Sequence, residues 1–150
     1  MIEGTRRVAG LAEVPKLLRR LGADPVAVLR CAGLPQTALD DPDVAISYAQ
    51  IGALLGCAAL ATGLEHIGLL TGAAWQLDHL GLVGQLVRNS LTFGDALQSA
   101  VLHHWLNGAG GAPFLFRAGS TVEIGYALYA TGVPHSDRVS SLCSRPRPAR

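Results

Sequence analysis

The sequence predicts one α+β domain, in which about six N-terminal helices pack against a C-terminal antiparallel β-hairpin or incomplete sheet. Apolar residues recur at helical spacing through the first two thirds of the chain, up to Leu106, whereas they alternate in the segment 121–129. A chain of 150 residues can form one core but is short for two independent domains. Helices first and strands last favour helices packed on one side of an antiparallel sheet.

Two short helices are expected after a flexible N-terminal leader. Residues 1–9 show no periodicity and are interpreted as that leader. Apolar side chains at helical spacing, with Lys and Arg on the opposite face, predict an amphipathic helix over 11–21. Asp24 as an N-cap, followed by proline at the first helical position, predicts a helix over 25–32 that ends at Gly33.

A longer helix follows in the segment 44–64, which has no charged residue over 21 positions and therefore raises the question of a membrane span. Ser47 and Gln50 form a capping box that starts the helix at Tyr48, and Gly63 ends it. The helix then spans roughly 22 Å, less than a hydrocarbon core of roughly 30 Å. We therefore predict a buried helix and no association with a membrane.

Gly52 and Gly56 lie one turn apart in this helix. Two small residues at this spacing let another backbone approach closely. We expect that neighbour to come from the same monomer, with a dimer contact as the alternative.

Three further helices are predicted over 65–72, 80–89 and 93–106. The last of them has a clear start signal. Thr92 can accept a hydrogen bond from the backbone N–H of Asp95, whose negative charge suits the N-terminus of a helix.

Near the end of the chain the spacing of apolar residues changes from a helical period to alternation. Residues 114–116 and 121–129, with Gly119 in the turn, predict a β-hairpin. An isolated hairpin is marginal in water, and the Pro- and Arg-rich segment 140–150 cannot supply another strand. We therefore expect a domain over 10–139 that is incomplete at its C-terminus, followed by a disordered tail over 140–150.

The charge of the chain argues against nucleic acid as a direct partner. Twelve Lys and Arg residues stand against eleven Asp and Glu residues, for a formal net charge of +1. A domain that binds DNA normally carries a basic patch, so we expect no direct DNA binding by this chain. The hydrophobic share of 49% is high, and part of the apolar surface is expected to need a partner.

Cys31, Cys57 and Cys143 make an odd count without metal-ligand spacing, and no secretory signal precedes them. A reducing cytoplasm is therefore the expected compartment. Cys31 and Cys57 lie in apolar helical patterns and are interpreted as small buried hydrophobic residues.

No catalytic, cofactor or metal constellation is evident. His103 and His104 would point about 100° apart on a helix, without a further ligand at i+4. Ser99, Ser120 and Ser136 lack a base and an orienting acid nearby. The 18 glycines form no phosphate-binding loop. The sequence thus predicts no enzyme, no cofactor and no metal site.

A ligand pocket in the helix-to-hairpin region is the remaining candidate site. Aromatic residues gather there, and a concave apolar site with a few polar groups is typical of ligand binding, although core packing is the alternative for most of them. The candidate ligand-binding residues are His103, Trp105, Phe114, Phe116, Tyr126 and Tyr129.

Five blocks occur in a distinctive order: 33–35 (GLP), 39–43 (LDDPD), 67–72 (IGLLTG), 80–84 (LGLVG) and 91–97 (LTFGDAL). In these blocks the chain resembles the effector-binding and dimerisation domain of AraC-type transcriptional regulators, in the branch described as arabinose-binding. The resemblance covers residues 10–139. It implies a small-molecule effector but transfers no residue-level effector motif. The paired helix-turn-helix units of such regulators have no counterpart in this sequence.

The resemblance implies a ligand-sensing domain of a bacterial regulator whose effector shifts the geometry of a dimer. The expected partners are a small molecule and a second copy of the chain, or an intact regulator in a heterodimer. We hypothesise that the regulator is truncated before its DNA-binding half and that the tail after Val139 is non-homologous sequence, for example from a shifted reading frame. The alternatives are a stand-alone small-molecule or haem-type sensor and a helical membrane-associated protein.

Overall fold

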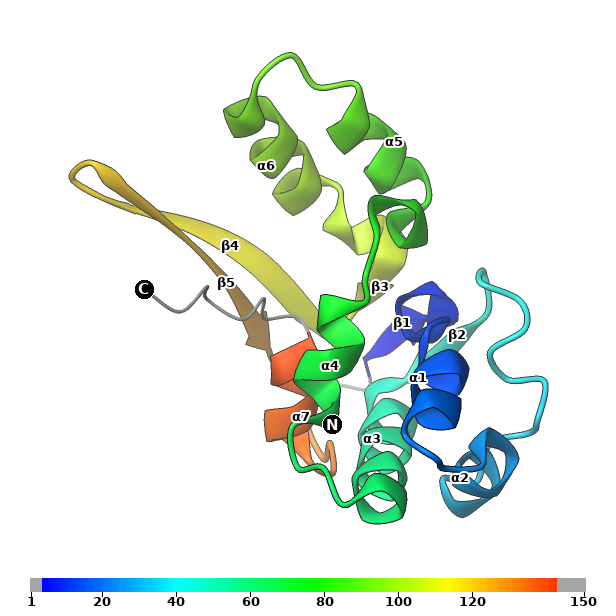
Figure 1. The fold of residues 1–150 in the computed structure, drawn as a ribbon. Helices are drawn as coiled ribbons and strands as arrows, with labels where there is room; N and C mark the ends of the chain where they lie inside the picture. The colour runs from blue at the N-terminus through cyan, green and yellow to red at the C-terminus, as the bar shows by residue number, and fades with distance from the viewer. Residues whose placement is uncertain (1–3, 143–150) are drawn as a thin grey trace.

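A computed structural model describes residues 4–142, with side chains described through Val139 (Figure 1). The fold is mixed α+β, as predicted. In chain order, the elements are β1 (Thr5–Arg7), η1 (Val8–Leu11), α1 (Val14–Arg20), α2 (Pro25–Cys31), β2 (Ala45–Ser47), α3 (Tyr48–Thr62), α4 (Ile67–Ala73), η2 (Leu77–Leu80), α5 (Leu82–Arg88), α6 (Phe93–Leu102), η3 (His104–Asn107), β3 (Gly108–Ala109), β4 (Gly111–Ala118), β5 (Thr121–Leu128) and α7 (Ser136–Leu142).

Helix α3 is the centre of a helical body that also contains α1, α2, α4 and α7 (Figure 1). Its side chains Ile51, Leu54, Leu55 and Ala58 are fully buried in one hydrophobic cluster with residues of α1, α2 and α7. Among the described residues, no single helix is long and apolar enough to cross a membrane. Helices α3 and α4 reach the required length and composition only as a pair, and the pair is bent by 107°.

The predicted helix ends are confirmed where local hydrogen bonds define them. Ser47 and Gln50 form the expected capping box, and Gly63 ends α3 in the left-handed conformation. Asp24 accepts backbone hydrogen bonds at the start of α2. Thr92 accepts the backbone N–H of Asp95 at 3.1 Å at the start of α6. These caps depend on residues within one turn, which is why the sequence reveals them.

The small-residue spacing in α3 serves packing within the monomer, as expected. A Cβ on Gly52 would lie 1.9 Å from the carbonyl oxygen of Pro134, and one on Gly56 would lie 2.4 Å from the His135 ring. The segment that leads into α7 therefore sits directly on the glycine face of α3.

The N-terminal leader requires a correction, because the segment starting at Thr5 is ordered as β1 and then η1. Strand β1 is the middle strand of a three-stranded antiparallel sheet of order β2-β1-β3. Arg6 pairs with Ile46 on one side and with Gly108 on the other. The expected order of helices first and strands last is also wrong, since β1 and β2 precede α3. Strands of two or three residues are too short to show an alternation of apolar and polar side chains, and their partner strands lie far away in the sequence. The sequence pattern therefore could not predict this sheet.

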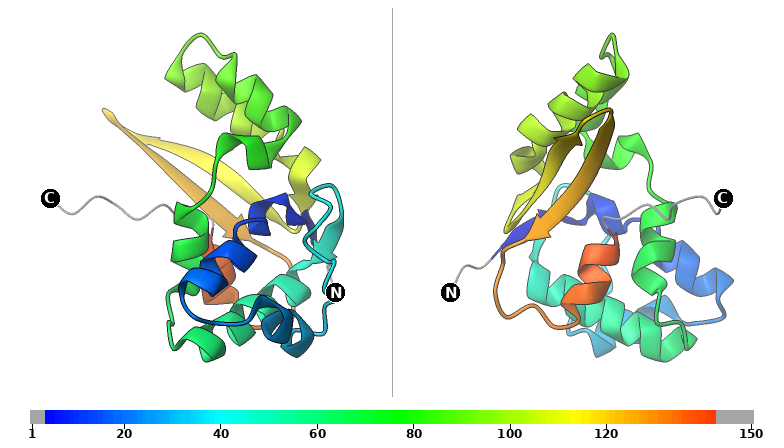
Figure 2. Two further views of the ribbon diagram at one scale, coloured as in Figure 1. Left: turned by 45° about the vertical axis from the view of Figure 1, so that its right-hand side comes forward. Right: turned by 90° about the vertical axis from the view of Figure 1, so that its left-hand side faces the viewer.

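Strands β4 and β5 form the predicted hairpin, with Gly119 at positive φ in its turn. It extends away from the helical body as a long ribbon beside α6 (Figure 2). The expected end of the ordered domain at residue 139 is wrong, because α7 follows the hairpin and continues to Leu142. The remainder of the expected tail, 143–150, lies outside the described residues.

Helices α5 and α6 pack against each other and stand apart from α1–α3 (Figures 1 and 2). Helix α6 buries none of its residues fully. Leu91 and Phe93, at the turn between the two helices, are 97% and 79% exposed. The high apolar content noted in the sequence therefore appears on the surface of this helix pair.

Candidate ligand-binding site

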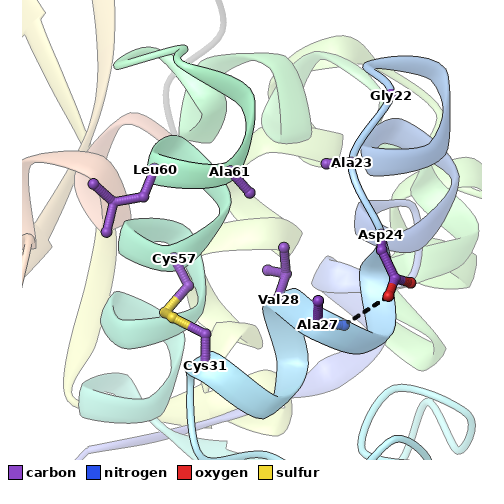
Figure 3. A pocket seen from close by; sticks show the side chains of 9 residues that line it. All are labelled: Gly22, Ala23, Asp24, Ala27, Val28, Cys31, Cys57, Leu60 and Ala61. Carbon is purple, nitrogen blue, oxygen red and sulfur yellow. Dashed lines mark hydrogen bonds between the residues drawn. A yellow bond between two sulfur atoms is a disulfide. The ribbon is translucent and has the colours of Figure 1, made fainter.

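The part of the chain that the structure describes includes three hollows that could receive a molecule, and their chemistry differs. The first lies between α2 and α3, has a volume of about 490 Å³ and is lined by mainly small or apolar residues (Figure 3). Its one charged group is Asp24, whose carboxylate accepts the backbone N–H groups of Val26 and Ala27. Because that carboxylate caps α2, this hollow offers little to orient a ligand.

A disulfide lies in the wall of this first hollow (Figure 3). Cys31 in α2 and Cys57 in α3 are bonded with their Cα atoms 6.1 Å apart. The interpretation of these cysteines as buried hydrophobic residues is therefore wrong. Cys31 is exposed and Cys57 is half-buried. Sequence could not pair them, since three cysteines leave every pairing open.

The second hollow lies between β1 and α5 and has a volume of about 450 Å³. Its cation, Arg7, forms an ion pair with Asp43 and donates to Asn107 Oδ1 at 3.0 Å. The two charges in its wall therefore compensate each other, and the hollow has no net electrostatic preference for a ligand.

The third hollow, which we call the Arg6 pocket, lies where the helical body meets the α5–α6 pair and the hairpin. It has a volume of about 170 Å³ and combines apolar walls with a few polar groups. Its lining residues are Arg6, Trp75, Leu80, Val83, Ala100, His104, Asn107, Pro113, Ile124 and Tyr126.

Arg6 is the buried cation of this pocket, with only 9% of its surface exposed. Its guanidinium carbon lies 5.3 Å from the ring centroid of Trp75 and 5.6 Å from that of Tyr126. Both distances are within the range of cation–π attraction. Arg6 Nη1 also donates to the Tyr126 hydroxyl at 3.2 Å. The central place of Arg6 in the three-stranded sheet thus directs a fixed positive charge between two aromatic rings.

Tyr126 is held in the pocket from several sides. Its hydroxyl oxygen lies 2.6 Å from that of Tyr48, the first residue of α3. Its ring also covers Gly111, where a Cβ would come within 2.6 Å of the ring. The absence of a side chain at position 111 therefore allows β4 to pass directly beneath the aromatic ring.

His104 supplies the second polar edge of the pocket. Its ring meets that of Tyr126 edge to face, with centroids 6.0 Å apart. Burial, and secondarily the charge of Arg6, lower the pKa of His104 below its usual value of 6.5, while a hydrogen bond with the Gly111 backbone opposes the shift. His104 is therefore neutral at pH 7, and Arg6 carries the charge of the pocket.

Of the six candidate residues named from the sequence, Tyr126 lines the pocket. His103 instead bonds to the carbonyl oxygen of Ser99 in its own helix, and Trp105 is 67% exposed. Phe114 and Phe116 lie on the other face of the hairpin. The register pairs Pro113 with Tyr126, so even-numbered residues of β5 share a face with odd-numbered residues of β4.

Tyr129 follows β5 and is also about half exposed, outside the pocket lining. The residues that sequence reasoning missed include Arg6 and Trp75. Arg6 stood in a segment interpreted as leader, and Trp75 in a loop. One sequence signal could have separated Tyr126 from the two phenylalanines. Side chains alternate between the two faces of the hairpin, and this alternation places Ile124 and Tyr126 on the same face.

Metal binding finds no support in the part of the chain that the structure describes. Within residues 4–142, no group of three His, Cys, Asp or Glu side chains is arranged to hold a metal ion. The chemistry available in the Arg6 pocket is therefore that of a cation, two aromatic rings, a neutral imidazole and apolar walls.

A largely apolar pocket with a few convergent polar groups is typical of small-molecule-binding domains. Residues 22–143 match the family model described as the arabinose-binding domain of AraC transcription regulator, N-terminal. The chain belongs to this family, in agreement with the resemblance seen in the sequence blocks. A search of individual curated proteins gave no match. Arg6 lies outside the matched segment, so the family match does not itself assign the pocket's cation.

Proposed function

We propose that this ligand-sensing domain binds its small-molecule effector in the Arg6 pocket and acts as a binding module without catalysis. The observation that carries the proposal is that the residues lining the pocket come from different parts of the fold. Arg6 comes from the sheet that borders the helical body, whereas Val83 and Ala100 come from α5 and α6, and Tyr126 comes from the hairpin. A ligand there contacts the three-stranded sheet, the α5–α6 pair and the hairpin at once.

This position suggests how binding is transmitted. Helices α5 and α6 are held to the rest of the domain through few buried side chains, since α6 has none and α5 buries only Val83 and Gly84. A ligand that contacts Val83, Ala100 and Tyr126 together favours one arrangement of the helix pair relative to the body. Binding then shifts the population of that arrangement by its differential affinity for it.

Dimerisation is the second part of the proposal, with another copy of this chain as the partner. Leu91, Phe93, Leu102 and Trp105 all present large apolar surfaces on or next to α6. Complete burial of such a side chain stabilises by about 1.5–3 kcal/mol. If the α5–α6 pair of a second copy covers these side chains, the dimer interface lies on the same helices whose arrangement the ligand changes.

The dimer is tested by sedimentation velocity over a range of protein concentrations. A monomer–dimer equilibrium that Phe93→Ser weakens at least tenfold is the expected result. A matched exposed substitution on the helical body, Leu60→Ser, should leave it unchanged. A chain that stays monomeric at every concentration, or equal effects of the two substitutions, would overturn this part.

The effector site is tested by thermal-shift screening against sugars, amino acids, organic acids and other metabolites. We expect at least one class to raise the melting temperature of the wild-type chain, and Tyr126→Phe to reduce the shift. A ligand that binds equally to both, with no change in Trp75 fluorescence, would place the effector site elsewhere. A complete absence of binders across the library would contradict effector binding by this chain.

A further inference from the structure

We propose that the disulfide between Cys31 and Cys57 is a reversible redox latch on helix α2, which small thiols open by attack at Cys31 and small disulfides close again. The bond lies in the wall of the first hollow, between α2 and α3 (Figure 3). That hollow shares no lining residue with the Arg6 pocket. The inference therefore goes beyond the proposed effector site and gives the sensing domain a second chemical input.

Helix α2 has a flexible joint at each end. Gly22 precedes the helix and Gly33 follows it, and both adopt positive φ, at 78° and 69°. Apart from chain neighbours, no atom lies within 4 Å of a Cβ built on either glycine. Glycine accepts a wider range of backbone conformations than other residues, and the open space leaves room for rotation. The segment between the two glycines can therefore move as one unit.

The noncovalent contact between α2 and the helical body is small. The helix packs against α1 and α3, and its buried residues are Pro25, Val28 and Leu29. Cys31, the last residue of α2, is bonded to Cys57 in α3. The bond thus holds the C-terminal end of α2 on the core helix. When the bond opens, a short apolar contact is what keeps α2 in place.

A small thiol can reach the bond from solvent. Cys31 is exposed, whereas Cys57 is half-buried. The hollow beside them, with a volume of about 490 Å³, is within the range of roughly 300–1,000 Å³ that is usual for ligand pockets. Exposed disulfides are in general reduced more readily than buried structural ones. We therefore expect the incoming thiol to attack the sulfur of Cys31.

The exchange has two steps. A thiolate attacks Cys31 Sγ, a new S–S bond forms there, and the bond to Cys57 breaks with its electron pair on Cys57 Sγ, which takes up a proton. A second thiolate attacks the small-molecule sulfur of the mixed disulfide and releases Cys31 as a thiolate. Two small thiols are thereby oxidised to their disulfide, and the protein bond is reduced by two electrons. The reverse sequence closes the latch.

Opening of the latch changes the surface between α2 and α3. Val28 and Leu29 are 3% and 4% exposed while the bond is closed. Movement of α2 away from α3 uncovers these side chains and widens the hollow that Val28 lines. The ratio of thiol to disulfide in solution thus sets how much apolar surface this side of the domain presents.

The attacked sulfur is identified with two single-cysteine chains. Every protein in these experiments carries Cys143→Ser, so that Cys31 and Cys57 are its only cysteines. Cys57→Ser then leaves Cys31 as the one thiol, and Cys31→Ser leaves Cys57. Mass spectrometry follows their reaction with glutathione disulfide. We expect Cys57→Ser to react at least tenfold faster, and equal or reversed rates would overturn attack at Cys31.

Hydrogen exchange at low urea concentrations distinguishes a latch from a simple staple. Global unfolding exposes much surface and responds strongly to urea, whereas a local opening responds weakly. In the oxidised chain, amides of α2 and α3 should show the same strong dependence on urea. After reduction by millimolar glutathione, α2 amides should exchange by a separate opening that low urea leaves unchanged, while α3 amides keep their dependence.

The other outcomes contradict the latch. If α2 follows α3 in both redox states, the bond only stabilises the whole fold. If α2 already opens separately in the oxidised chain, the bond does not hold it. Loss of α3 protection on reduction, or a folded chain whose bond resists glutathione, would also overturn the proposal. The double variant Cys31→Ser, Cys57→Ser is the control and should behave as the reduced chain with or without glutathione.

Discussion

The hydroxyl groups of Tyr48 and Tyr126 lie 2.6 Å apart, although 78 residues separate them in the chain. Tyr48 begins α3 and is almost completely buried, whereas Tyr126 belongs to the hairpin and lines the Arg6 pocket. Arg6 donates to the same Tyr126 hydroxyl. One hydrogen-bonded series therefore joins the central strand of the sheet, the hairpin and the first turn of the core helix.

Tyr126→Phe should show how much this series stabilises the domain. The substitution removes hydrogen bonds to Tyr48 and to a charged partner, and the expected loss in the free energy of unfolding is about 2 kcal/mol. Urea denaturation measures it. Tyr129→Phe, at a half-exposed position just after the same strand, is the matched control and should cost less than about 0.5 kcal/mol. Equal losses would mean that the hydroxyl pair contributes little.

Gly52→Ala should destabilise the domain, because its Cβ would collide with the carbonyl oxygen of Pro134. We expect a loss of about 2 kcal/mol or more, since backbone would have to move. Gly94→Ala in α6 is the control, because the nearest atom to its Cβ is Thr92 Oγ1 at 3.7 Å. That change should stabilise by up to about 1 kcal/mol through helix propensity. Thermal unfolding of both variants checks the difference in sign.

Reduction of the disulfide between Cys31 and Cys57 should lower stability. The two residues are 26 positions apart, and a closed loop of that length corresponds to about 3.5 kcal/mol in the chain-entropy estimate. Denaturation with and without reductant measures the effect. Cys57→Ser should match the reduced wild-type chain and should no longer respond to reductant. A wild-type midpoint that reductant leaves unchanged would contradict a stabilising bridge.

His104 should make stability depend on pH in one direction. Its pKa in the folded chain is lowered, so between that value and 6.5 the unfolded chain binds more protons at this residue than the folded chain does. The free energy of unfolding therefore falls as pH drops below about 6.5, and His104 adds no dependence above that pH. Urea denaturation from pH 5 to 8 should show a shallower slope for His104→Gln than for wild type. His66→Gln, at an exposed position, is the control; equal slopes for the two variants would contradict the effect.

The two faces of the hairpin should differ in their effect on ligand binding. Ile124 and Phe116 are similarly exposed, but only Ile124 shares the face of Tyr126 and lines the pocket. Ile124→Ser should weaken a ligand of the Arg6 pocket several-fold, and Phe116→Ser should leave its affinity within about twofold. Titrations followed by Trp75 fluorescence compare them. A stronger effect of Phe116→Ser would place the ligand on the opposite face.

Much of the helical part could be predicted from the sequence, because its signals are local. The start of α3 at Tyr48 and its end before Gly63 follow from hydrogen bonds within one turn and from the conformational freedom of glycine. The hairpin turn at Gly119 was predictable for the same reason. The position of α7 was not, since the segment before it packs on α3 through the contact of Pro134 with Gly52, two residues that lie far apart in the chain.

The candidate site was predicted less well than the fold. The sequence indicated the helix-to-hairpin region and Tyr126, and that region does contribute to the pocket. It could not identify Arg6, because a three-residue strand carries no pattern that distinguishes it from a leader. Nor could it separate His104 from His103, since the chain leaves α6 for η3 between them and the two side chains then meet different neighbours.

By itself the sequence determined most of the helices, the hairpin, the family and the nearly neutral net charge, because caps, periodicity and composition are properties of neighbouring residues. Tertiary structure alone decided the three-stranded sheet, the pairing of Cys31 with Cys57 and the burial of Arg6 between Trp75 and Tyr126. Each of these joins segments that are far apart in the chain. The sheet is stabilised by strand pairing, the two cysteines by a covalent bond, and the buried arginine by its contacts with the aromatic rings. All of these interactions form only after the distant segments have come together.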